Sequence, residues 1–315
     1  MTYIERKEEL LKTEIIPQTK EADFEEFWEE QIKMLRKKPL KIERRALDLP
    51  YKTFKTYEIV YNTHDDTLVT AYFCVPCTHN GEKLPCVALY HGGGGSFGVC
   101  PEFVATGVCT FCMDTRSQGG KTYDHAEYEP ADDYHGGHGI MSHGLLDKEN
   151  FYMRNIYLDA VRAIDVIATL PEVDADKIVA HGQSQGGALT IVASALSGKV
   201  KRAYPSVPSY ACIEKRVEKA SGVFGAVNAY LRAHPEDTDR VLKVLSYFDV
   251  NNMVSLLKIP TEFFLGLEDP ICLPPFVYSP YAHTKAEKNI VFGVFTPHYI
   301  SKEYQYKLLG DLASL

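Results

Sequence analysis

Hydrophobic and polar positions follow three different rhythms along the chain. Over residues 1–40 the apolar positions recur at steps of three and four, a spacing that predicts amphipathic helices. The apolar stripe of this region consists of Phe24, Phe27, Trp28, Ile32 and Leu35. We expect the stripe to pack on the core, and the single tryptophan to be a core residue rather than a ligand platform.

Residues 40–75 alternate between apolar and polar side chains, as half-buried strands do. Two alternating runs, Tyr57–Asn62 and Leu68–Phe73, flank the polar segment 62–67. An antiparallel hairpin with its turn in this segment is therefore predicted.

From Pro85 onward, short apolar runs alternate with helical patterns. The runs are Cys86–Tyr90, Val108–Met113, Lys177–Ala180, Ala203–Val207, Thr261–Leu265 and Ile290–Phe295. The helices expected between them are Asn155–Leu170, Gln185–Leu196 and Val217–Ala233. This alternation predicts an α/β fold whose mostly parallel central sheet is flanked by helices. The stretch 116–150 has little periodicity, and an irregular segment of that length is often functional.

Composition narrows the possible partners. The 315 residues carry a formal net charge of -8, which argues against nucleic acid or an anionic membrane as the main partner. No apolar run approaches the roughly 18 residues of a membrane span. The charged N-terminus lacks the apolar core of a signal peptide, so we expect a cytoplasmic protein with reduced thiols.

Eight cysteines include two C-x-x-C pairs, Cys74/Cys77 and Cys109/Cys112. Such pairs can form a zinc site. Here both lie in apolar, β-rich stretches, and the gap between them is longer than in the usual zinc ribbon. Buried free thiols are the favoured interpretation, and no metal is expected.

A G-x-S-x-G run, Gly182-Gln-Ser-Gln-Gly186, lies between an apolar run and a helical segment. It is similar to the turn that carries the serine nucleophile of α/β-hydrolases, where the serine is held in a strained backbone conformation. Ser184 is therefore the predicted nucleophile. The N–H of Gln185, at the start of the helix, is the expected first donor to an oxyanion. An ordinary glycine-rich turn is the alternative.

A serine nucleophile needs a histidine base, which in α/β-hydrolases comes late in the chain. Three histidines follow Ser184: His234, His283 and His298. His298 follows the last apolar run, on the loop where such a base belongs, whereas the other two lie in polar helical segments. We predict that His298 is the base.

The orienting carboxylate should leave the strand that precedes the base. Glu268 and Asp269 both follow the apolar run that ends at Leu267. Asp269 is the preferred candidate, with an ordinary turn-forming aspartate before Pro270 as the alternative.

The second oxyanion donor should come from the loop after an early strand. The segment Leu89-Tyr-His-Gly-Gly-Gly-Gly-Ser96 is such a loop, and Gly93 is the expected donor. A merely flexible loop is the alternative. A phosphate-binding loop is disfavoured, because no Gly-Lys-Ser/Thr follows.

With these residues assembled, the chain resembles the acetyl xylan esterase/cephalosporin-C deacetylase family, carbohydrate esterase family seven, over nearly its whole length. The matching segments are Asp23–Trp28, Arg116–Gly120, Gly144–Asp147, Tyr152, Arg154, Tyr157–Ala163, Leu170–Asp174, Gly182–Gly187, Tyr247–Asn251 and Gly266–Asp269. Their occurrence in this order is far more specific than any single motif.

The resemblance implies one α/β-hydrolase domain over residues 1–315, with residues 1–80 as an N-terminal extension plus first strands and residues 81–315 as the catalytic core. It implies a serine esterase that removes O-acetyl groups from small sugars, xylo-oligosaccharides and cephalosporins. It also implies a homohexamer whose active sites face an internal cavity, and no metal or other cofactor. Arg116 is expected to anchor a buried ion pair.

Several positions depart from the family pattern. Its His-Gly-Tyr reads His91-Gly92-Gly93, so a tyrosine that borders the acyl pocket in the family is absent. Its Arg-Gly-Gln carries Ser117 as the middle residue, its Gly-His-Glu ends in Tyr299, and Phe276 replaces a serine after the acid. We expect Gly92, Phe276 and Tyr299 to border an altered substrate pocket, and an acyl group other than acetyl is a live hypothesis.

A histidine-rich loop contains His135, His138 and His143 beside two aspartates. A metal site and a loop near the cavity or an oligomer contact are the two interpretations, of which the second is favoured. For the whole chain, a thioesterase or peptidase on the same fold, and a catalytically silent carbohydrate-binding or assembly protein, are the alternatives to an esterase.

Overall fold

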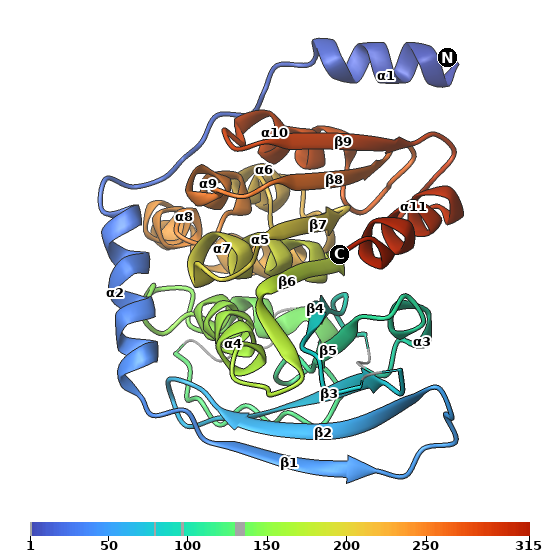
Figure 1. Ribbon diagram of the computed structural model, residues 1–315. Helices are drawn as coiled ribbons and strands as arrows, with labels where there is room; N and C mark the ends of the chain where they lie inside the picture. The colour runs from blue at the N-terminus through green and yellow to red at the C-terminus, as the bar shows by residue number, and fades with distance from the viewer. Residues whose placement is uncertain (1, 79, 96–97, 130–135) are drawn as a thin grey trace.

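The computed structural model describes residues 2–78, 80–95, 98–129 and 136–315. Within them a nine-stranded sheet has the order β1-β2-β3-β5-β4-β6-β7-β8-β9 (Figure 1). The strands are β1 (Ile42–Leu47), β2 (Phe54–Asn62), β3 (Leu68–Pro76), β4 (Leu84–Tyr90), β5 (Cys109–Met113), β6 (Val173–Gln183), β7 (Arg202–Ser206), β8 (Thr261–Gly266) and β9 (Lys288–Gly293).

The pairing of the strands divides the sheet into two parts. Antiparallel ladders join β1, β2, β3 and β5, in that order. The remaining neighbours, in the order β5-β4-β6-β7-β8-β9, all pair in parallel. The predicted hairpin is formed by β2 and β3, with Asn62 opposite Leu68. The mostly parallel α/β sheet expected from the apolar runs is thereby confirmed, and β1 is an additional edge strand.

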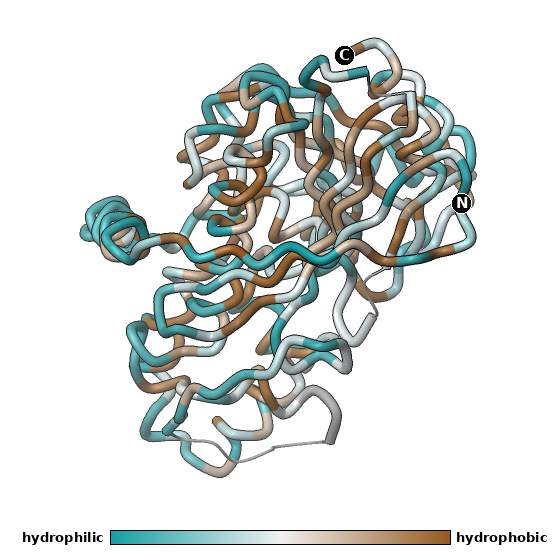
Figure 2. Tube along the Cα trace, turned by 60° about the horizontal axis from the view of Figure 1, so that its bottom comes forward, coloured by the Kyte–Doolittle hydropathy of each residue, from teal (hydrophilic) through white to brown (hydrophobic). Residues whose placement is uncertain are grey.

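Helices cover both faces of the sheet. They are α1 (Tyr3–Lys12), α2 (Phe24–Lys37), α3 (Pro101–Val104), α4 (Tyr152–Ile167), α5 (Gln185–Ser197), α6 (Ile213–Glu218), α7 (Gly225–Ala233), α8 (Thr238–Ser246), α9 (Val250–Met253), α10 (Pro274–His283) and α11 (Lys302–Ala313). α2, α4 and α5 pack in the main core, whereas α3 and α11 lie on the other face of the sheet (Figure 1). Hydrophobic positions gather along the central strands (Figure 2).

The N-terminal region contains two helices rather than one continuous run. α1 lies apart from α2, beside α10 and β9 (Figure 1). The whole apolar stripe of α2 is buried, as predicted. Trp28 is fully buried, and its Nε1–H donates to the carbonyl of Tyr247 at 2.9 Å, which identifies it as a core residue.

The single helix expected over residues 217–233 is wrong. The segment consists of α6, a 3₁₀ turn at Gly222–Phe224 and α7. Ala220 and Gly222 have φ values of 47° and 58°, a left-handed conformation that a right-handed helix cannot contain. The helical periodicity of the sequence continues through this break, so the pattern alone does not reveal the turn between α6 and α7.

The strand geometry explains the second C-x-x-C pair. Cys109 and Cys112 both lie in β5, and residues three apart in a strand face opposite sides of the sheet. Cys109 accordingly packs in the main core, and Cys112 packs with α3 and α11. A shared metal at these two thiols is geometrically incompatible with the strand. In the part of the chain that the structure describes, no helix is both long and apolar enough to cross a membrane.

Arg116 connects three parts of the fold, as the expectation of a buried ion pair requires. Its guanidinium is fully buried and makes a bidentate pair with Asp159 of α4, with both bonds at 2.7 Å. It also binds Asp65 of the β2–β3 turn at 2.7 Å and Asp124 at 3.0 Å. Burial raises the pKa of Asp159, and Arg116 limits that rise to about 6.

We predict that Arg116→Lys lowers the free energy of unfolding by about 3 kcal/mol or more, because a single ammonium cannot replace the fork between buried carboxylates. Urea unfolding followed by circular dichroism measures the change. Arg45→Lys is the matched control: it alters an exposed pair with Glu58 and should cost less than about 1 kcal/mol. Equal losses in the two variants would contradict the anchoring role.

Candidate active site

Ser184 lies on a sharp turn between β6 and α5. Its φ of 58° and ψ of -119° place a non-glycine residue in a sparsely populated conformation. The turn is held by two backbone hydrogen bonds of 3.0 Å: the Ser184 N–H donates to the Ser206 carbonyl, and the Ser209 N–H donates to the Ser184 carbonyl. The strained serine is thus fixed against β7 and the segment that follows it.

Glycines make this turn possible. A Cβ on Gly186 would lie 1.9 Å from the Tyr90 carbonyl oxygen, and one on Gly182 would lie 2.5 Å from the same oxygen. A Cβ on Gly187 would lie 2.6 Å from the Ser206 carbonyl oxygen. The G-x-S-x-G-G pattern is therefore a packing requirement, because the backbone of α5 passes directly against the ends of β4 and β7.

The structure brings Asp269 and His298 together. Asp269 follows β8, and its Oδ2 lies 2.8 Å from Nδ1 of His298 on the loop after β9. The Asp269 side chain is fully buried, and its Oδ1 accepts the backbone N–H groups of Ile271 and Cys272, each at 2.8 Å. With both oxygens engaged, the carboxylate is locked in position and orients the imidazole.

The loop that carries His298 is packed onto the end of β8. A Cβ on Gly266 would lie 2.5 Å from the carbonyl oxygens of Thr296 and Pro297. Gln183, next to Ser184, donates its side-chain N–H to the His298 carbonyl at 2.9 Å. This bond connects the serine turn directly to the histidine loop.

Cys272 completes the surroundings of Ser184. The Ser184 hydroxyl lies close enough to the Cys272 thiol to act on its pKa, which burial raises to about 11. Among the described residues no Ser184–His298 hydrogen bond is recorded. Catalytic hydrogen bonds are often long in unliganded enzymes and shorten when substrate binds.

The loop after β4 lies against the serine turn. A Cβ on Gly92 would lie 3.8 Å from the Ser184 Cβ, and one on Gly93 would lie 3.7 Å from the Gln185 side-chain oxygen. Gln185 is the first residue of α5, so its N–H has no partner within the helix. Both predicted oxyanion donors therefore come from segments that adjoin the serine.

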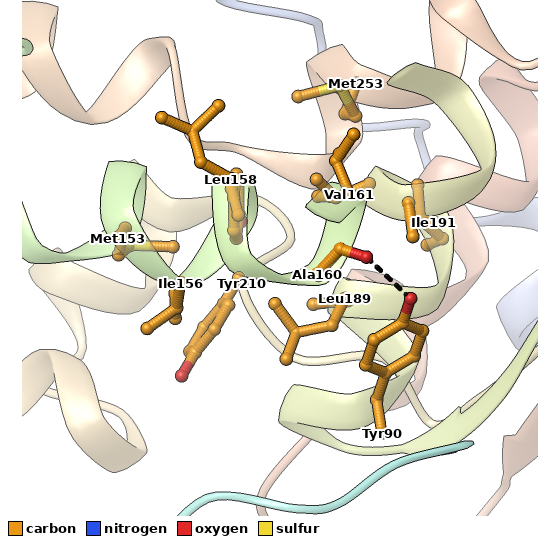
Figure 3. Packing of buried hydrophobic residues seen from close by; sticks show 14 of the residues in the cluster. Tyr90, Met153, Ile156, Leu158, Ala160, Val161, Leu189, Ile191, Tyr210 and Met253 are labelled. Atoms are coloured by element: carbon orange, nitrogen blue, oxygen red, sulfur yellow. Dashed lines mark hydrogen bonds between the residues drawn. The ribbon is translucent and has the colours of Figure 1, made fainter. Parts of the chain in front are cut away.

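His91 gives this loop its shape. The Thr115 N–H donates to Nε2 at 2.9 Å, which leaves the proton on Nδ1 to donate to the Gly92 carbonyl at 2.8 Å. Burial lowers the pKa of His91, which favours this neutral form. Just before it, the Tyr90 hydroxyl donates to the Ala160 carbonyl of α4 at 2.9 Å and anchors the end of β4 (Figure 3).

A polar network holds the Gln185 side chain. Gln118 and Gln185 exchange two amide hydrogen bonds, of 2.7 and 2.8 Å, and the Tyr210 hydroxyl donates to Gln185 Oε1 at 2.5 Å. Gln118 Oε1 also accepts the Gly94 N–H at 3.1 Å. Gln118 therefore joins the glycine loop to the residue that follows the nucleophile.

Two of the predicted pocket residues lie in contrasting surroundings. Phe276 is buried in α10. The Arg216 guanidinium lies over its ring, with the guanidinium carbon 5.1 Å from the ring centroid. Arg216 itself is buried and donates to the carbonyls of Ala211 and Ile271, so it bridges the walls on either side of the site. Tyr299, by contrast, is half exposed beside His298.

Asp269, Cys272 and His298 also form a group that could hold a metal ion, with ligand atoms within 4.8 Å of one another. The hydrogen bond between the aspartate and the histidine, and the positive charge of Arg216 beside the thiol, favour a metal-free acid–base pair instead. A second group, at residues 234–237, lies on the surface away from Ser184.

The other candidate histidines lie elsewhere. His234 ends α7 and stacks on Tyr230, and His283 ends α10 with Nε2 2.8 Å from the Ile16 carbonyl oxygen. In the histidine-rich loop, His143 stacks on Tyr128, whereas His135 and the side chain of His138 lie outside the described residues. Glu268, the alternative acid, forms an exposed ion pair with Arg6.

Sequence reasoning missed four residues that shape the site. Gln118 lies in the Arg116–Gly120 segment that carries the family resemblance, but no role is predicted for it from the sequence. Tyr210, Arg216 and Cys272 lie outside the motifs that point to Ser184. For Tyr210 a signal did exist: it lies in a short irregular segment after a strand, where Val207, Tyr210 and Cys212 all have positive φ. Such strain collects at functional sites, but it is visible only in the structure.

A mostly parallel sheet, a strained serine after one of its central strands, and an Asp–His pair on later loops define a serine hydrolase of the α/β-hydrolase fold. The acetyl xylan esterase (AXE1) family model matches residues 1–310. The chain belongs to this family and is a carboxylic ester hydrolase.

Named relatives agree with this assignment. The chain is 26% identical to acetyl esterase Axe7A of Xylanibacter ruminicola, over 95% of this chain and 67% of that protein. An acetyl xylan esterase from Paenibacillus sp. R4 superposes with a TM-score of 0.88 and 30% identity, over 95% of this chain and 96% of that one. Acetyl xylan esterase 1 from Thermoanaerobacterium sp. has the same fold, with a TM-score of 0.88 and 23% identity over 100% and 98% of the two chains.

We predict that Gly182→Ala lowers kcat/KM for an ester at least about a hundredfold. The new methyl group would collide with backbone atoms, and the shift that relieves the collision would misalign Ser184 with the ester. Steady-state kinetics on p-nitrophenyl acetate measure the loss. Gly310→Ala in α11 is the control, since a Cβ there meets no atom within 4 Å. Full activity in the Gly182 variant would show that the turn tolerates displacement.

Proposed function

We propose that this esterase removes O-acetyl groups from small acetylated carbohydrates, such as xylo-oligosaccharides, through a Ser184–His298–Asp269 acyl transfer. The observation that carries the residue assignment is the Asp269–His298 hydrogen bond on loops that adjoin the strained Ser184 turn. Family membership and the names of the relatives support the carbohydrate ester as substrate. Activity on cephalosporin C is a secondary expectation of the same kind.

The geometry of the pair assigns the proton transfers. Because Nδ1 of His298 donates to Asp269, Nε2 is free to take the Ser184 hydroxyl proton as the oxygen attacks the ester carbonyl. The carbonyl oxygen gains negative charge, and the expected donors to it are the N–H groups of Gln185 and Gly93. The proton then passes from Nε2 to the departing sugar oxygen.

The acyl-enzyme is resolved by the same groups in reverse. Nε2 of His298 takes a proton from water, the hydroxide attacks the acyl carbonyl, and Ser184 recovers its proton as the acid is released. Asp269 stabilises the imidazolium that forms in each half-reaction. Assembly as a hexamer and a cytoplasmic location, both expected from the sequence, stay predictions.

We predict that Ser184→Ala lowers kcat on acetylated xylo-oligosaccharides by at least about a thousandfold and leaves the circular dichroism spectrum unchanged. Mass spectrometry after a fluorophosphonate probe should place one adduct on Ser184. Ser314→Ala, at the exposed end of the chain, is the control. An active Ser184 variant would refute the nucleophile.

The rival functions separate in the same assays. A thioesterase or peptidase would hydrolyse acyl thioesters or aminoacyl amides faster than the sugar ester. A silent binding protein would neither react with the probe nor release acetate. The Asp269–His298 bond, which a binding protein would not require, favours the catalytic alternative.

The acyl pocket is expected to admit chains longer than acetyl, because Gly93 stands where the family resemblance places a tyrosine. A larger residue fits at this position: a Cβ would be at ordinary contact distances of 3.7 and 4.0 Å from Gln185, and the φ of Gly93 is not positive. We predict that Gly93→Tyr reduces kcat/KM for p-nitrophenyl butyrate about tenfold more than for the acetate.

Gly93→Ala is the matched control and should leave the ratio of butyrate to acetate almost unchanged. A wild-type enzyme that strictly prefers acetate would disprove a wide pocket at Gly93. It would leave the assignment of Ser184 untouched.

A further inference from the structure

Two thiols meet at the end of the loop that follows β4. The Cys112 Sγ–H donates to Cys100 Sγ, with 3.7 Å between the sulfur atoms, and both cysteines are reduced. A disulfide has an S–S length of about 2.05 Å, so the two atoms would have to approach by roughly 1.7 Å.

One member of the pair is accessible. Cys100 is half-buried and Cys112 is buried, and both thiols line a cavity of about 210 Å³. The cavity is also bounded by His91 and Gly92 of the glycine loop and by Gln183 of the serine turn. A small reagent that enters this cavity reaches both thiols next to the backbone of the active site, and Cys100 is the more exposed of the two.

The two thiols differ in how firmly they are held. Cys112 lies within β5, where it is opposite Leu89 of β4 on one side and Tyr72 of β3 on the other. Cys100 lies in the irregular segment before α3. Because the sheet fixes Cys112, the approach of the sulfur atoms has to displace Cys100.

We propose that Cys100 and Cys112 form a reversible disulfide under peroxide and that this bond lowers the turnover of the esterase. In the first step the Cys100 thiolate attacks hydrogen peroxide and the O–O bond breaks, which gives a sulfenic acid and hydroxide. The hydroxide takes up the proton that the Cys100 thiol had released and becomes the first water. In the second step Cys112 sulfur attacks the Cys100 sulfur, the S–O bond breaks, and a second water forms with the Cys112 proton. Overall, two thiols and one peroxide give one disulfide and two waters.

The hydrogen-bonding pattern supports this order of events. The bond donated by Cys112 lowers the pKa of Cys100, which favours the thiolate at the accessible sulfur. The Cys112 thiol keeps its proton, since its pKa is raised by the bond to Cys100 and by burial. The attacking and resolving thiols are thereby distinguished.

The disulfide is expected to lower turnover because Cys100 adjoins the residues next to the expected oxyanion donor. This part rests on the proposed esterase mechanism. Cys100 lines the same cavity as His91 and Gly92, and Gly92 directly precedes Gly93, the expected oxyanion donor. Displacing Cys100 in this cavity wall misaligns that donor, and errors of about 1 Å at such sites can cost two orders of magnitude in rate.

The test treats purified enzyme with hydrogen peroxide, traps free thiols with iodoacetamide in denaturant and maps the peptides by mass spectrometry. We expect a linked peptide pair containing Cys100 and Cys112. We also expect kcat on p-nitrophenyl acetate to fall at least about tenfold and to recover with dithiothreitol.

Cys100→Ser and Cys112→Ser should each keep their activity under the same treatment. Cys77→Ser, which alters the surface cysteine, is the matched control and should lose activity as the wild type does. If both thiols are still alkylated after peroxide, or if the disulfide leaves kcat unchanged, the proposal is overturned. It is also overturned if the two serine variants lose activity as fast as the wild type. The disulfide is detected without substrate, so this result is separate from any failure of the esterase assignment.

Discussion

The structure depends on one close contact, between the backbone at the end of β4 and the backbone at the start of α5. The Tyr90 carbonyl oxygen occupies the space that a Cβ on Gly182 or Gly186 would need. This contact sets how closely α5 packs against the ends of the strands. It thereby also sets the positive-φ conformation of Ser184, which lies between β6 and α5. It also brings the loop after β4 against the serine. Ser184, the proposed nucleophile, and the expected oxyanion donors are therefore positioned by the same backbone packing.

Strain of this kind persists only where the surroundings compensate for it. Here the compensation is a set of buried polar contacts around the turn. The Tyr90 hydroxyl binds α4, and Gln118 and Tyr210 hold the side chain of Gln185. Where such a group is buried, as the Tyr210 hydroxyl is, leaving it unpaired would cost about 1–3 kcal/mol, so these contacts stabilise one arrangement over its alternatives. The position of Ser184 thus depends on side chains that hold its neighbours in place.

Parts of this arrangement could be predicted from sequence because their signals are local. The apolar runs from β4 to β9, the β2–β3 hairpin and the stripe on α2 are each visible within a short window. Ser184, Asp269 and His298 can be selected because each follows an apolar run and because they occur in the order Ser, Asp, His along the chain. Gln118 and Tyr210 could not be found in this way, because their role lies in contacts with Gln185 across 67 and 25 residues.

Backbone contacts and side-chain contacts have different consequences at the site of this enzyme. The backbone contacts position the reacting groups, and the side-chain contacts shape the walls that the ester meets. At positions 182, 186, 187 and 266 an added Cβ would collide with main-chain atoms, so these glycines cannot vary without moving the serine or the histidine loop. Gly93 faces only the Gln185 side chain at ordinary contact distances, and Tyr299 is half exposed. Substitution at these two positions changes the walls of the site while the backbone contacts stay intact. Departures from the family pattern at positions 93 and 299 are therefore expected to alter which ester is accepted, and not whether the serine can attack it.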